Sequence, residues 1–101
     1  MIGQYILNAA GEPELCEDLY VWARWLKTGN RVIAQHGNHD EVFVSTVFLG
    51  LDYQFWSGPP LLYETMVFGG PLDGEQNKYT TKAEAVAGHE EMVRRVKDAQ
   101  V

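Results

Sequence analysis

The feature that most constrains this chain is a pair of apolar segments, residues 41–49 and 61–68, that predict two neighbouring strands. Side chains of a strand point alternately to its two faces. In both segments the alternating sets are each mainly apolar, so neither strand has a clean polar face. Such strands are typical of a sheet that is covered on both faces. A chain of 101 residues has few helices for this purpose, and we therefore expect a homo-oligomer, most simply a dimer, that shields one face.

The other segments place helices and strands around this pair. In chain order the patterns predict a strand at 4–7, a helix within 12–28, a strand at 31–36, the strands at 41–49 and 61–68, and a helix from 81 to about 99. This order, β-α-β-β-β-α, favours an α+β fold in which two helices cover one face of a mostly antiparallel sheet. No repeat or linker divides the chain, so we expect residues 1–101 to form a single domain.

Both predicted helices carry start signals. Pro13 suits the first turn of the first helix, where its missing N–H is not needed, and Leu19 and Trp22 continue an apolar stripe. At the start of the last helix, Thr81 and Glu84 have the spacing of a capping box.

Charge and composition argue against several classes of protein. The net charge is −6, with 14 acidic and 8 basic side chains, which argues against direct binding along a nucleic-acid backbone. The single cysteine, Cys16, forms no internal disulfide, and the first residues lack the basic and apolar regions of a signal peptide. No stretch approaches the roughly 18 apolar residues of a membrane span. We expect a soluble cytoplasmic protein without membrane contact.

His89 is the most unusual residue of the last helix, because it lies within the apolar stripe. One interpretation is structural, with the imidazole bonded in the core to a backbone carbonyl or to Ser45, Thr46 or Thr65. The other is catalytic, with Glu64 orienting the imidazole in an acid–base couple. The spacing alone does not decide between them.

The loop between the two central strands carries the strongest binding signal. It contains Asp52, Tyr53, Phe55 and Trp56, and Trp25 of the first helix falls outside the apolar stripe of that helix. Exposed aromatic side chains stack on planar ligands and anchor protein interfaces. These five residues are the candidate ligand-binding set. The alternative is that the rings fold back onto the core or pack within a dimer.

Metal and cofactor motifs are weak. His36, His39 and Asp40 offer three metal-binding side chains within a tight turn, but the sequence shows no evident fourth ligand. No dinucleotide-binding, phosphate-loop or hydrolase signature occurs. We expect neither a metal nor a cofactor.

One string is more specific than these patterns. The segment VSTVFLGLDYQFWSGPPLLYETMVFGGPLD, followed by Tyr79-Thr80-Thr81 and Gly88-His89, resembles a group of small uncharacterised proteins of bacteriophages and prophage-bearing bacteria. The resemblance implies a phage or bacterial cytoplasmic setting and carries over no catalytic residue. The loop of this chain, with Phe55 and Trp56, is bulkier than the glycine-rich loop of that group.

Three functions follow as hypotheses. The first is a non-enzymatic phage accessory module, with an anti-defence role, that acts on a host protein or sequesters a small nucleotide-like ligand. If the module sequesters a nucleotide-like ligand, the aromatic residues would stack on its base, and Arg31 or Lys78 would contact its phosphate. An alternative is a small hydrolase- or lyase-like enzyme that uses Glu64 and His89, assisted by Asp52 or Ser45. A further alternative is a structural phage component.

Overall fold

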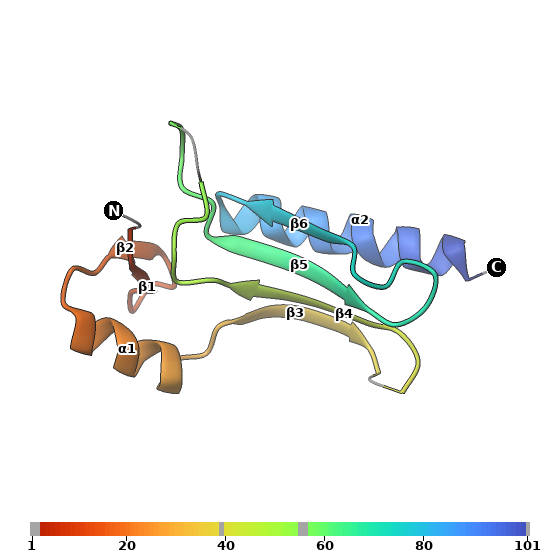
Figure 1. The fold of residues 1–101 in the computed structure, drawn as a ribbon, viewed down its shortest axis with the longest axis horizontal. Helices are drawn as coiled ribbons and strands as arrows, with labels where there is room; N and C mark the ends of the chain where they lie inside the picture. Colours follow the sequence, from red (N-terminus) through yellow and green to blue (C-terminus); the bar gives the residue numbers. More distant parts are fainter. Residues whose placement is uncertain (1–2, 39, 55–56, 101) are drawn as a thin grey trace.

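The computed structural model describes residues 3–38, 40–54 and 57–100. Within these residues it contains two helices and two antiparallel sheets, which confirms the α+β class predicted from the sequence (Figure 1). The elements in chain order are β1 (Tyr5–Leu7), β2 (Pro13–Leu15), α1 (Leu19–Thr28), β3 (Val32–Gly37), β4 (Phe43–Phe48), β5 (Tyr63–Phe68), β6 (Gln76–Tyr79) and α2 (Lys82–Ala99).

The larger sheet has the strand order β3-β4-β5-β6, so each strand pairs with the next one along the chain. At its centre, Val44 lies opposite Val67 and Thr46 lies opposite Thr65. Residues directly opposite each other in an antiparallel pair point to the same face. These four buried residues therefore share one face, which we call the covered face.

The long helix α2 lies along the covered face and contacts all four strands, behind the sheet in Figure 1. Val44 and Val67 pack against Met92 and Val96 of this helix, and all four side chains are buried. Burying an apolar side chain of this size contributes roughly 1.5–3 kcal/mol. The capping box predicted at the start of α2 is confirmed, with Thr81 Oγ1 accepting from the Glu84 N–H at 3.1 Å.

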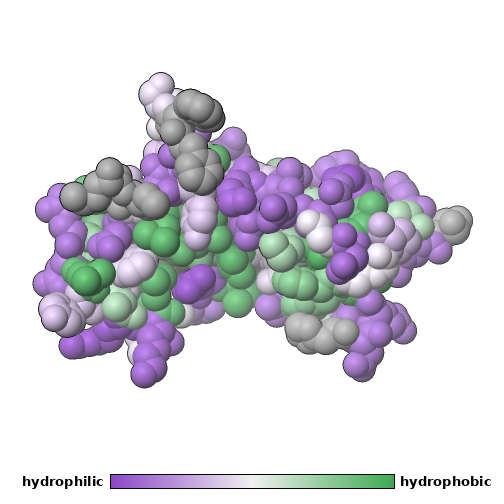
Figure 2. Space-filling view, in the orientation of Figure 1, coloured by the Kyte–Doolittle hydropathy of each residue, from purple (hydrophilic) through white to green (hydrophobic). Residues whose placement is uncertain are grey.

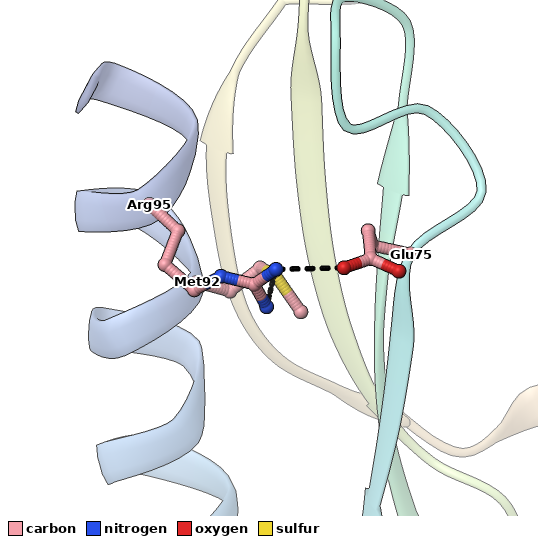
Figure 3. Close-up of polar contacts among 3 residues, drawn as sticks. All are labelled: Glu75, Met92 and Arg95. Atoms are coloured by element: carbon pink, nitrogen blue, oxygen red, sulfur yellow. Dashed lines mark hydrogen bonds and ion pairs between the residues drawn. The ribbon is translucent and has the colours of Figure 1, made fainter. Parts of the chain in front are cut away.

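The C-terminal half of α2 is also tied to the turn that joins β5 to β6. The Arg95 guanidinium donates to Glu75 Oε1 at 2.7 Å and lies 3.5 Å from the sulfur of Met92 (Figure 3). Because both charged groups are well exposed, such a pair adds roughly 0–1 kcal/mol. It orients the turn more than it stabilises the fold.

The short helix α1 reaches the covered face from its end. The Trp25 ring stands edge-on against Phe48, with ring centroids 5.5 Å apart, and Phe48 is fully buried beside Tyr63. The Trp22 indole N–H donates to the carbonyl of Gly50 at 2.9 Å, which fastens α1 to the end of β4. Both helices thus contribute to one face, although α2 supplies nearly all of the cover.

The start of α1 differs from the prediction. The segment with Pro13 is strand β2, which pairs with β1, and the helix begins at Leu19. The Asp18 carboxylate accepts from the N–H groups of Tyr20 and Val21 at 2.9 and 3.1 Å. A side-chain cap of this kind satisfies two of the free donors of a first turn, which Pro13 cannot do.

Strand β6 is not predicted by the sequence pattern. Its residues are polar apart from Tyr79, and it pairs with β5 at the edge of the sheet. A strand of four residues with a single apolar side chain shows no apolar alternation, which is the pattern that predicts a strand from the sequence.

Candidate functional site

The face of the larger sheet opposite α2 carries the candidate site, and we call it the open face. Its position follows from strand alternation, because its residues lie between those of the covered face. It comprises Val32 and Gln35 of β3, Phe43, Ser45 and Val47 of β4, Glu64, Met66 and Phe68 of β5, and Gln76 and Lys78 of β6. Among the described residues, no helix packs on this face.

Apolar side chains on the open face remain partly in contact with solvent. Phe68 is 47% exposed and Val32 is 44% exposed, whereas Met66 and Val47 are half-buried. Phe43 is buried against Phe68, with ring centroids 6.3 Å apart. Figure 2 looks onto this side and shows hydrophobic side chains gathered along the sheet with hydrophilic ones among them. The mixture resembles a protein interface more than a solvated sheet face.

A charged pair and an aromatic ring lie together toward one end of the open face. Lys78 Nζ is 3.1 Å from Glu64 Oε2, and the same ammonium lies 5.7 Å from the centroid of the Tyr53 ring. Lys78 and Glu64 face each other across β5 and β6, so the sheet register sets the ion pair. The cation therefore has two partners within the chain.

The described residues of the loop, 52–54 and 57–61, project from the body of the molecule beside this group (Figure 1). The Asp52 carboxylate accepts from the backbone N–H of Gln54 at 2.8 Å and of Leu61 at 3.0 Å. These two bonds close the base of the loop, so Asp52 acts as a brace. Tyr53 is 39% exposed at that base. Phe55 and Trp56, the other predicted binding residues of the loop, lie outside the described residues.

Trp25, the fifth residue of the predicted ligand-binding set, lies apart from this group. Its ring packs on Phe48 under the covered face, where it completes the second core cluster.

Beneath α2, a chain of polar side chains crosses the apolar core. His89 Nδ1 lies 2.7 Å from Thr46 Oγ1, which lies 2.5 Å from Thr65 Oγ1. The Tyr79 hydroxyl donates to Thr65 Oγ1 at 3.1 Å. Thr46 and Thr65 are fully buried and His89 is 7% exposed. The structural interpretation of His89, with Thr46 as its partner, agrees with this geometry.

The direction of this hydroxyl chain determines the state of the imidazole. If Tyr79 donates to Thr65, Thr65 to Thr46, and Thr46 to His89, every hydroxyl proton has an acceptor. That direction requires an unprotonated Nδ1. Burial, with a smaller effect of the His36 charge, lowers the pKa of His89 and favours this neutral form, while Glu90 acts weakly in the opposite direction.

Gly88 explains how Tyr79 reaches the hydroxyl chain. A Cβ atom on Gly88 would overlap the Tyr79 ring, so only glycine lets the phenol lie against the backbone of α2. In the sequence, the only sign of this contact between Tyr79 and α2 is the glycine that directly precedes His89. Its meaning is not evident without Tyr79, which arrives from the unpredicted strand β6.

Glu64 and His89 do not meet. Glu64 points to the open face, where it pairs with Lys78, whereas His89 bonds to Thr46 beneath the covered face. The acid–base couple considered from the sequence is therefore not formed. Asp52 braces the loop and Ser45 lies on the open face, so neither assists His89.

No family model, curated protein or solved structure matches this chain. Across residues 3–38, 40–54 and 57–100, no group of three acidic, histidine or cysteine side chains is placed to hold a metal ion. In the same part of the chain, neither helix is long and apolar enough to cross a membrane.

Proposed function

We propose that this protein is a non-enzymatic binding module in which two copies pair through the open face and the projecting 52–61 loops contact a partner protein. The observation that carries the proposal is the open face itself, where exposed Phe68 and Val32 lie beside half-buried Met66 and Val47 without a covering helix among the described residues. A second copy would bury these side chains, and apolar burial is the main driving force of such pairing.

Charge supports a second copy as the occupant of the open face. Glu64 and Lys78 lie next to each other, so the face carries both signs at one place. A two-fold axis brings the same patch of two copies together, and a patch with both signs can offer each charge an opposite partner. This pair therefore adds no net charge to the interface.

The loop is the part that stays free for a partner. It projects from one edge of the molecule, and its braced base holds Tyr53 in a fixed place. Tyrosine is a frequent anchor of protein interfaces because a rigid ring supplies area at low entropic cost. The resemblance to phage proteins supports a host protein as partner, which would be an accessory, anti-defence role in the host cytoplasm.

A protein partner suits the site better than a nucleotide-like ligand does. The cation that would meet a phosphate, Lys78, is already paired with Glu64, and Glu64 would repel the anion. Arg31 donates its Nε–H to the carbonyl of Phe48 at 3.1 Å. The Trp25 ring packs edge-on against Phe48 of the covered face, on the other side of the sheet from Lys78.

Binding of bacterial proteins to the immobilised chain tests the proposal. Candidates identified by mass spectrometry are purified and titrated by calorimetry against wild type, Tyr53→Ala and a matched control, Val86→Lys, at an exposed position of α2. We expect Tyr53→Ala to weaken binding by about tenfold or more and the control to bind as wild type does. Equal binding by Tyr53→Ala, or saturable heats with mononucleotides and cyclic dinucleotides but with no protein, would contradict it.

A further inference from the structure

Lys78 connects the open face to the projecting loop. It is the only basic side chain of the open face among the described residues, and the sheet register places it opposite Glu64. Its ammonium also lies 5.7 Å from the centroid of the Tyr53 ring, at the base of the loop. A cation within about 6 Å of a ring centroid is attracted to the ring. One side chain therefore contacts both parts of the proposed binding module.

The braced base of the loop fixes the backbone of Tyr53, and Lys78 acts on its ring. The Tyr53 N–H donates to the carbonyl of Leu61 at 3.1 Å, beside the two bonds that Asp52 accepts. Among the described residues, the Tyr53 hydroxyl makes no hydrogen bond, and the ring is 39% exposed. The contact with Lys78 is therefore the interaction that draws the ring toward the sheet.

Solvent weakens this contact in a single chain. The Lys78 side chain is 29% exposed, and that of Glu64, its ion-pair partner, is 16% exposed. The attraction between a cation and a ring is stronger where water is excluded, because water screens the charge. A second copy on the open face would cover Lys78 and remove part of that water. Pairing of the open faces should therefore strengthen the hold of Lys78 on the Tyr53 ring.

We propose that Lys78 is a positioning residue that couples pairing of the open faces to the presentation of Tyr53, so that the paired form holds this ring more firmly for a partner than the single chain does. This role rests on the proposed function, because it needs both the dimer and the partner-binding loop. Coupling is reciprocal, so the ring must in turn strengthen the pairing. In a two-fold dimer the contact occurs once in each copy, and its effect on pairing counts twice.

The dissociation constant of the dimer, measured on the full chain, tests the coupling without any partner protein. Tyr53→Leu removes the ring and is expected to raise this constant about tenfold in sedimentation equilibrium. The matched control Tyr53→Phe keeps the ring and should pair as wild type does. A Tyr53→Leu variant that pairs as tightly as wild type would overturn the coupling and leave the dimer of open faces standing.

A double-mutant cycle separates the action of Lys78 from a direct contact between the ring and the second copy. Lys78→Met keeps a long side chain and loses the charge, so in its background Tyr53→Leu should no longer change the dissociation constant. An undiminished effect of Tyr53→Leu in that background would assign the ring to the interface itself and overturn the role of Lys78.

Ring-current shifts give a direct readout in the wild-type chain. Protons above an aromatic ring resonate upfield, so the ε-methylene protons of Lys78 should move further upfield as the protein concentration rises through the pairing range. An unchanged shift in the dimer would contradict the proposal. A wild type that stays a single chain at every concentration would instead refute the pairing of open faces in the proposed function, and the coupling with it.

Discussion

The two faces of the larger sheet differ in which side chains they bury. On the covered face the polar side chains Thr46, Thr65 and His89 are buried, and each bonds to another polar side chain. On the open face, exposed Phe68 and the Glu64–Lys78 pair meet solvent side by side. The comparison teaches that polarity does not mark the outer side of this sheet. On the covered face the buried polar groups have hydrogen-bond partners. On the open face apolar area remains uncovered, and such area is typical of a surface that binds a partner.

The largest loss of stability is expected from a substitution that disrupts the packing of α2 on the covered face. Gly88→Ala places a Cβ atom where the Tyr79 ring lies, so the phenol must leave its position against α2. We expect a loss of about 3 kcal/mol in unfolding free energy, at the upper end for overpacking. Denaturant unfolding measures it. The double variant Gly88→Ala/Tyr79→Leu should recover part of the loss, and equal losses in both would disprove the overlap.

The next effect separates neighbouring residues that point to opposite faces. Thr46→Val keeps the shape of the side chain but breaks the hydroxyl chain at its centre, which should cost about 2 kcal/mol. Ser45→Ala on the open face should change unfolding by less than about 0.5 kcal/mol. Thermal and denaturant unfolding compare the two. Similar losses in both variants would remove the distinction between the faces.

The third effect is a dependence on pH. Because the folded chain lowers the pKa of His89, the unfolded chain takes up the proton first as the pH falls. The contribution is fully present above an unfolded pKa of about 6.5, and stability declines below it by at most about 1.4 kcal/mol per pH unit. His89→Asn, although less stable, should show a flatter profile between neutral and mildly acidic pH. A profile parallel to wild type would mean that His89 does not titrate in this way.

The smallest intrinsic effect belongs to the open face. In dilute solution Phe68→Lys should lose only about 1 kcal/mol, because the ring is half exposed and gives up mainly its contact with Phe43. In concentrated solution wild type should gain stability through pairing, and the variant should not. Melting temperatures measured across a concentration series show the difference. A parallel rise in both proteins would place the pairing elsewhere.

Much of the fold could be predicted from local signals. Alternation in β4 and β5 separates Thr46 from Ser45 and Thr65 from Glu64, and the structure keeps those divisions. Thr81 and Glu84 predict the start of α2, because a capping box involves only residues that are close in sequence. The start of α1 was harder to predict, since Pro13 and Asp18 both suit a helix start and only the pairing of β1 with β2 decides between them.

The site was less predictable because its contacts join distant parts of the chain. His89 and Thr46 lie far apart in sequence, and several hydroxyls were equal candidates for the bond. Asp52 is of a residue type that is common in binding sites, but its carboxylate accepts hydrogen bonds from the backbone at both ends of the loop.

The molar mass in solution tests the pairing of open faces most directly. Light scattering or sedimentation equilibrium at up to about 100 µM should give twice the 11.4 kDa of one chain for wild type and for Val86→Lys, and the mass of one chain for Phe68→Lys. A wild-type mass of one chain over this whole range, or a dimer that Phe68→Lys leaves intact, would contradict the role given to the open face.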